Sequence, residues 1–83
     1  MRKTIKIVGV RKRQVGIGKR TGLPYDFTNF AITYDHPFYD GLKAEEVGID
    51  TEIIGDRVIN PGDTLEVEMF SVNFKTRIGA IYG

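Results

Sequence analysis

The 83-residue sequence contains no cysteine, no tryptophan, one histidine and three prolines. Without cysteine the chain forms no disulfide and holds no zinc through thiolates, although so short a chain buries only a modest core. Self-association is the remaining way to bury more surface, so we expect a homodimer.

Long apolar runs are also missing from the sequence. No stretch approaches the roughly 18 apolar residues of a membrane span, and charged residues follow Met1 without an apolar signal core. We therefore expect a single domain over residues 1–83, located in the cytoplasm and without a membrane partner.

Residues typical of catalysis are scarce. His36 is the only histidine, and Ser71, the only serine, lacks a Gly-x-Ser-x-Gly context. A lone histidine near Asp35 and Asp40 is a weak metal pattern, and the glycines after Val15 do not follow Gly-x-Gly-x-x-Gly spacing. The sequence therefore predicts no enzyme, with no catalytic residue, no metal site, no cofactor and no small-molecule substrate.

Positive charge is concentrated at one end of the chain. The first 22 residues contain no acid and eight of the 12 basic residues, which are Arg2, Lys3, Lys6, Arg11, Lys12, Arg13, Lys19 and Arg20. A basic segment on a chain of net charge +1 favours a polyanionic partner on one face. The alternative is that these charges are solvated on an exposed strand, where lysines also discourage aggregation.

Alternation of β-branched and charged residues predicts a first strand over Thr4–Ile17. Its phase changes at Gly9, which predicts a β-bulge. A glycine-rich basic turn follows, and then a second strand over Tyr25–Asp35. The two strands are expected to form a long hairpin.

The second predicted strand has aromatic residues on both faces. Phe30, Ile32 and Tyr34 share one face, whereas Tyr25 and Phe27 share the other. A chain without tryptophan needs large side chains to fill its core, and to this core we assign Phe30, Tyr34, Phe70 and Phe74.

The middle of the chain breaks the strand pattern. Residues 36–49 are predicted to form a connecting loop with a short helical turn at Leu42–Val47. Apolar runs on either side of Gly55-Asp56 predict a tight hairpin or a bent strand, and residues 60–63 predict a turn.

The last predicted strand pair spans Thr64–Tyr82. A second phase change follows Met69, Lys75–Arg77 is expected to form the hairpin tip, and Ile78–Tyr82 the return strand. The sequence thus predicts an all-β fold, a five-stranded small barrel with bulged strands and one short helical turn in its middle connection.

Six of the nine aromatic residues lie within residues 25–39, directly after the basic turn. Cations neutralise phosphates, and every nucleobase stacks on Tyr or Phe regardless of its sequence. The chain offers no recognition helix for a duplex groove, which favours a single-stranded nucleic acid. No feature of the sequence indicates contact with a 2′-hydroxyl, so the sequence does not distinguish DNA from RNA as the ligand.

Two stretches carry a family resemblance. Residues 20–25, Arg-Thr-Gly-Leu-Pro-Tyr, resemble the Arg-x-Gly-Lys-Pro-Tyr hairpin of the filamentous-phage single-stranded DNA-binding, or helix-destabilising, proteins. The C-terminal hairpin of that family is similar to the series Pro61-Gly62, Val67, Ser71, Phe74-Lys75 and Ile78-Gly79. Residues 35–59 do not follow the family, which fits a distant relative from a phage or mobile element.

This resemblance implies an OB-like five-stranded barrel, a symmetric homodimer and the coating of single-stranded DNA during replication in a bacterial host cell. It also implies that Arg20 contacts phosphate, that Tyr25 and Phe27 stack on bases, and that Ile78, beside Arg77, replaces a stacking aromatic.

The nucleic-acid-binding residues that we predict are Arg11, Arg13, Lys19, Arg20, Tyr25, Phe27, Arg77 and Ile78. Two other readings stay open. A small-barrel protein-interaction module would use the basic strand to dock an acidic protein, and an RNA-binding protein would repress a message.

Overall fold

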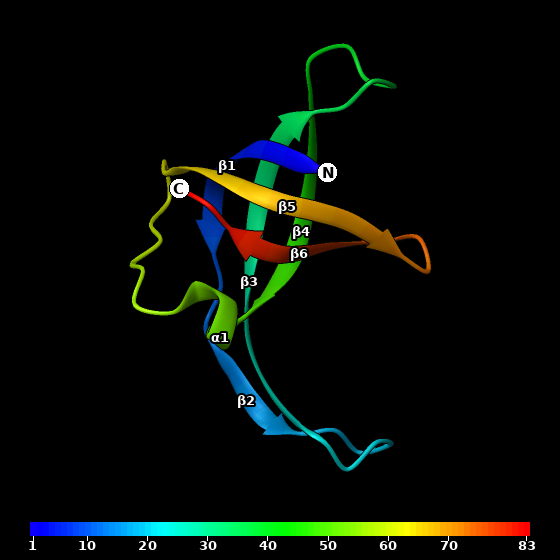
Figure 1. Cartoon of the computed structure of the whole chain (residues 1–83), viewed down its shortest axis with the longest axis vertical. Helices are drawn as coiled ribbons and strands as arrows, with labels where there is room; N and C mark the ends of the chain where they lie inside the picture. The colour runs from blue at the N-terminus through cyan, green and yellow to red at the C-terminus, as the bar shows by residue number, and fades with distance from the viewer.

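The computed structural model describes all 83 residues as an antiparallel sheet of six strands with one helical turn (Figure 1). Its elements are β1 (Arg2–Val10), β2 (Gln14–Ile17), β3 (Pro24–Asp35), β4 (Leu42–Asp50), α1 (Thr51–Ile54), β5 (Thr64–Val72) and β6 (Lys75–Ile81). The predicted all-β class is confirmed. No helix has the length and apolar character that a membrane crossing requires.

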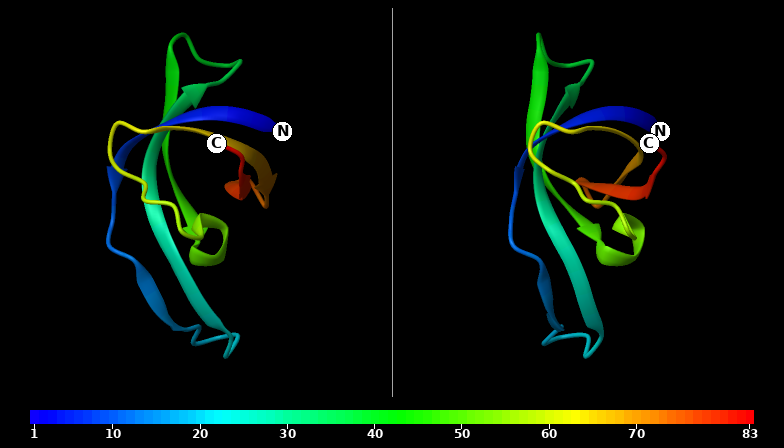
Figure 2. Two further views of the ribbon diagram at one scale, coloured as in Figure 1. Left: turned by 60° about the vertical axis from the view of Figure 1, so that its left-hand side comes forward. Right: turned by 90° about the vertical axis from the view of Figure 1, so that its left-hand side faces the viewer.

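The longest strand, β3, organises the sheet. β4 pairs along one edge of it, and β1 and β2 pair one after the other along the opposite edge. β1 also pairs with β5, and β5 with β6. The sheet curves strongly and places β5 and β6 across from β3 and β4 (Figure 2).

The structure differs from the predicted five-stranded small barrel in two respects. β4 and β6 approach each other but do not pair, so the sheet stays open. The predicted first strand is also divided, because residues 11–13 leave the strand conformation. The Arg11 N–H still donates to the Asn29 carbonyl at 2.9 Å, which keeps β1 and β2 on one edge of β3.

The bulge predicted near Gly9 is confirmed. Ile7 pairs with Ile32 and Gly9 with Ala31, so Val8 is the extra residue. Ile7 is buried while Val8 is half exposed, and the bulge increases the local bend of β1. The second irregularity lies on β6, where Gly79 is the extra residue between two paired positions.

The core is one cluster built from five strands. Its members are Ile5, Ile7, Phe30, Ile32, Tyr34, Val47, Ile49, Leu65, Val67, Met69 and Ile78. The assignment of Phe30 and Tyr34 to the core is confirmed. The assignment of Phe70 and Phe74 is wrong, because Leu65, Val67 and Met69 occupy the core-facing parity of β5 and Phe74 lies in the exposed turn after it.

The predicted connecting loop is confirmed only over residues 36–41, and the helical turn predicted at Leu42–Val47 is wrong. Residues 42–50 form β4, which pairs with β3 over its whole length. The helix-favouring Ala44 and Glu45 are overridden by this pairing and by the burial of Val47 and Ile49.

The connections after β4 also differ in part from the prediction. The helical turn forms at Thr51–Ile54 and ends at Gly55, so no hairpin forms there. The turn at residues 60–63 is confirmed, with the Asp63 N–H donating to the Asn60 carbonyl. The tip of the β5–β6 hairpin lies at Asn73-Phe74, earlier than predicted.

Candidate nucleic-acid interface

The β2–β3 hairpin projects from the rest of the sheet, at the lower end of Figure 1. Its tip is a compact turn, in which the Gly18 N–H donates to the Leu23 carbonyl and the Gly22 N–H to the Gly18 carbonyl, each at 2.9 Å. Gly22 has φ +66°, a conformation that residues other than glycine rarely adopt. The turn therefore holds Lys19 and Arg20 at the far end of the molecule, where both are exposed and form no ion pair.

Tyr25 and Phe27 lie on the outer face of β3, close to this tip. Their ring centroids are 5.7 Å apart, at an angle of 48° between the planes. Tyr25 is exposed and Phe27 is half-buried, whereas Phe30, on the opposite face, is buried. The structure thus places one exposed and one half-buried aromatic ring on the strand that follows a tip with two unpaired cations.

Glycines on the neighbouring strands accommodate these two rings. A Cβ atom at Gly16 of β2 would lie 2.5 Å from the Tyr25 hydroxyl oxygen, and one at Gly48 of β4 would lie 3.4 Å from a ring carbon of Phe27. Each ring therefore leans over a neighbouring strand that has no side chain at that point.

Arg11 reaches from the end of β1 to β4. Its Nη1 is 3.3 Å from Glu46 Oε1 of β4, and both side chains are largely exposed. Exposed ion pairs contribute little to stability. Arg11 can therefore exchange Glu46 for a phosphate at small cost.

Arg13 has a different role. Its Nε donates to Asp26 Oδ1 at 2.7 Å, its Nη2 contacts the second oxygen, and Thr51 Oγ1 donates to Asp26 Oδ1 at 2.6 Å. Hydrogen bonds from Arg13, and then from Thr51, lower the pKa of Asp26 to about 2. The bond from Asp26 likewise raises the pKa of Arg13. By the alternation of β3, Asp26 lies on the face opposite Tyr25, where it links Arg13 to Thr51 of α1.

The two predicted site residues on β6 lie outside the hairpin. Ile78 is buried in the core opposite Met69, so the prediction that it contacts nucleic acid is wrong. Arg77 is exposed and pairs with Phe70 in the strand register. The exposed aromatics of this region are Phe70 and, at the hairpin tip, Phe74.

Sequence analysis missed the contribution of β4, because it placed these residues in a loop. Gly48 and Glu46 complete the outer face beside Phe27 and Arg11. The alternation that ends in Val47 and Ile49 was the signal for this strand. No group of three or more His, Cys, Asp or Glu side chains is arranged to hold a metal ion.

Comparison of the chain with known proteins finds no matching family model, no matching curated protein and no matching solved structure. The resemblance to the phage single-stranded DNA-binding proteins therefore stays a prediction. The case for a function depends on the residues of the hairpin and of the outer face of β3.

Proposed function

We propose that this protein is a non-enzymatic single-stranded DNA-binding protein that coats DNA with little sequence preference. The observation that carries the proposal is the position of Tyr25 and Phe27 on one accessible face, beside a hairpin tip with the unpaired Lys19 and Arg20. The cations neutralise phosphates and release counterions. The rings stack on splayed bases, which a stacked duplex does not offer.

The pairing order of the strands supports the same function. Counted with β1 and β2 as one bent strand, the order is β4-β3-β1-β5-β6, as in the partly open OB fold. OB folds bind oligonucleotides on the face of their second and third strands and with two of their loops. Those features correspond here to β3 and β4, and to the tips of the two hairpins. This correspondence is an analogy between folds. It supports the proposed function in addition to the hairpin residues, which remain its main basis.

A homodimer is part of the proposal. Phe70, Val72 and Phe74 are exposed on the β5–β6 hairpin. Contiguous exposed apolar residues typically mark an interaction surface, and a small protein without disulfides benefits from burying them against a second copy.

The experiment that tests the proposal measures affinity for oligo-dT and for a blunt duplex of equal length over a range of salt concentrations. We expect oligo-dT to bind far more tightly, with an affinity that falls steeply with salt. Arg20→Ala should reduce the salt slope by about one unit, and Arg57→Ala, an exposed arginine outside the hairpin, should leave it unchanged. Equal affinity for the two DNAs, or a slope insensitive to Arg20→Ala, would contradict the proposal.

Oligo-U is the second arm of this experiment. If it binds more tightly than oligo-dT, an RNA-binding function replaces the DNA-binding one. If no nucleic acid binds, the hairpin serves a protein-interaction module with an acidic partner.

A further inference from the structure

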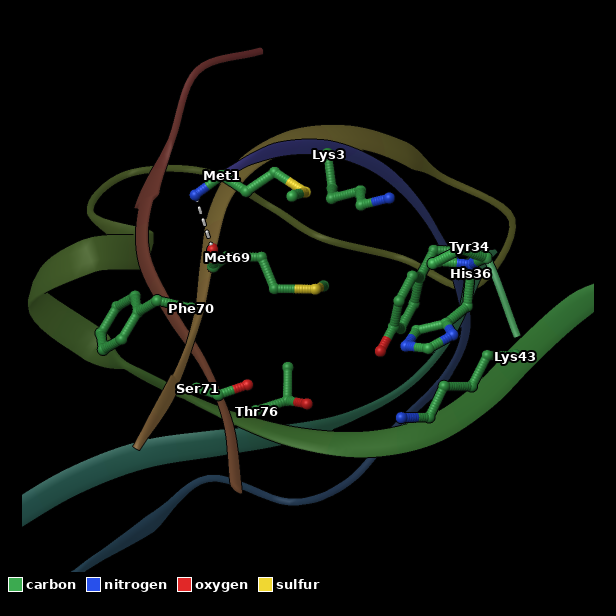
Figure 3. A pocket seen from close by; sticks show the side chains of 10 residues that line it. Met1, Lys3, Tyr34, His36, Lys43, Met69, Phe70, Ser71 and Thr76 are labelled. Carbon is green, nitrogen blue, oxygen red and sulfur yellow. Dashed lines mark hydrogen bonds between the residues drawn. The ribbon is translucent and has the colours of Figure 1, made fainter. Parts of the chain in front are cut away.

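A cleft of about 660 Å³ opens at the other end of β3 from the hairpin. Figure 3 shows Tyr34 and His36 on one side of it, with the Met69 side chain pointing toward them from β5. Met1 lies near Met69, and Thr76 lies below. The cleft therefore has aromatic rings on one wall and thioethers on the other.

The aromatic wall is held in place by its neighbours. The Tyr34 hydroxyl donates to Glu45 Oε1 at 2.9 Å, and this side chain is almost fully buried. His36 lies 5.3 Å from the Phe38 ring and 5.5 Å from the Tyr39 ring, centroid to centroid. The wall thus combines the buried Tyr34 with a cluster of rings from the loop after β3.

Polar groups surround the cleft at its edges. Lys43 is neutralised by Glu45 at 3.2 Å, whereas Lys3 contacts only the Asp35 carbonyl oxygen, at 3.3 Å, and has no carboxylate partner. His36 Nδ1 accepts the Phe38 N–H, so the neutral ring carries its proton on Nε2, which is free to donate. The cleft thus combines a free cation with a ring N–H donor.

We propose that this cleft binds one nucleotide, with its base against the His36 ring and the exposed Met1 thioether, above the buried Tyr34 and Met69, and its phosphate on Lys3. Planar aromatic groups suit such walls, because rings stack and thioether sulfur makes favourable contacts with aromatic faces. The volume falls in the usual range of small-ligand sites. The inference rests on the proposed function for a nucleotide within a bound strand, and the same chemistry accepts a free nucleotide.

The sequence contains only two methionines, and both line the cleft. In NMR spectra of the full chain, the methyl signals of labelled methionine therefore report on the cleft alone. The probes are dTMP and thymidine, titrated separately. We expect both methyl signals to shift as the base stacks, and dTMP to bind more tightly than thymidine because only dTMP carries a phosphate.

Two variants sharpen the assignment. Lys3→Gln should weaken the binding of dTMP by about threefold or more and leave the binding of thymidine unchanged. His36→Ala should weaken the binding of both probes. Lys12→Gln removes an exposed cation outside the cleft and is the matched control for Lys3→Gln. Methyl signals that stay fixed with both probes overturn the inference, as does equal weakening of dTMP by the two lysine variants.

Oligo-dT separates this inference from the proposed function. Oligo-dT that binds through the hairpin while neither dTMP nor thymidine moves the methyl signals contradicts only the cleft site. Methyl shifts with dTMP but no binding of oligo-dT contradict only the proposed function. Competition between oligo-dT and dTMP identifies a nucleotide of the strand as the occupant, and simultaneous binding identifies a free nucleotide; either result supports the site.

Discussion

The two exposed hairpins of this protein share one architecture and differ in chemistry. In both, an aromatic ring of one strand leans over a glycine of the next strand, Tyr25 over Gly16 in the β2–β3 hairpin and Phe70 against Gly79 in the β5–β6 hairpin. The tip of the first hairpin carries lysine and arginine, whereas that of the second carries the fully exposed Phe74 before Lys75. The first hairpin suits a polyanion, and the exposed ring gives the second an apolar contact surface.

This difference shows how one fold can separate two binding tasks. A cationic tip is costly to bury against a second copy of the same chain, because the like charges would repel and lose water. An apolar tip gains from such burial and little from phosphate. We therefore expect substitutions in the two hairpins to affect different measurements, and the predictions below test that separation.

The largest expected effect compares a core aromatic with an exposed one. Phe30→Ala should leave a cavity and lower the free energy of unfolding by roughly 3–5 kcal/mol, because Phe30 is 2% exposed. Phe70→Ala should cost about 1 kcal/mol or less, because Phe70 is 45% exposed. Urea denaturation of both variants at one protein concentration measures this. Equal losses would show that Phe70 packs as a core residue.

The sequence alone predicted which side chains face the core wherever this depends only on the alternation of residues within one strand. The parity of β3 assigned Phe30 and Tyr34 to the core and Tyr25 and Phe27 to the outer face, and their burial follows it. The same reasoning applied to β5 places Phe70 outward. The prediction failed there because it assigned the large side chains by the volume that a core needs, and not by the parity of their strand.

Features that depend on distant parts of the chain could not be predicted. Ala44 and Glu45 favour a helix locally, and only pairing with β3 makes them part of a strand. The cleft is built from five strands, so no local motif indicates it. The site residues of the first hairpin were accessible to sequence reasoning because charge, glycines and aromatics follow one another within residues 16–27.

The second prediction concerns binding of single-stranded DNA. Tyr25→Ala or Phe27→Ala should weaken oligo-dT by roughly 1–3 kcal/mol, the usual contribution of one stacked base. Phe74→Ala should leave the affinity nearly unchanged, because its hairpin is assigned to self-association. Fluorescence titration of folded variants at one salt concentration measures this. An equal loss for Phe74→Ala would show that both hairpins contact DNA, and the separation of tasks would be lost.

The third prediction uses the backbone of the second hairpin. Asn73 and Phe74 have φ of 51° and 66°, and a turn with both central residues in this region strongly prefers Asn-Gly. A bulky residue there costs of order 1 kcal/mol. Phe74→Gly should therefore stabilise the monomer by about 1 kcal/mol and weaken the dimer, because the exposed ring is lost.

Unfolding measured at a low protein concentration reports the monomer, and sedimentation reports the dimer. Phe74→Ala is the matched control, since it removes the ring without relieving the backbone. If Phe74→Gly leaves the wild-type dimer intact, the apolar tip does not mediate association, and the contrast between the hairpins reduces to the charge of the first.

The smallest expected effect is the pH dependence of the Arg13–Asp26 pair in the first hairpin. The pKa of Asp26 is about 2 in the folded chain, against an ordinary value of 3.8. The pair therefore stabilises the fold above the ordinary pKa, and this contribution is lost as the pH falls toward 2. Asp26→Asn carries no charge at any pH, so its stability deficit relative to wild type should shrink between about pH 6 and about pH 2. Chemical denaturation across that range measures the deficit, and Asp40→Asn, which removes a carboxylate without an ion pair, is the control. A deficit that does not change with pH would mean that Arg13 is free of Asp26, and Arg13 would then join Lys19 and Arg20 as a phosphate contact of the first hairpin.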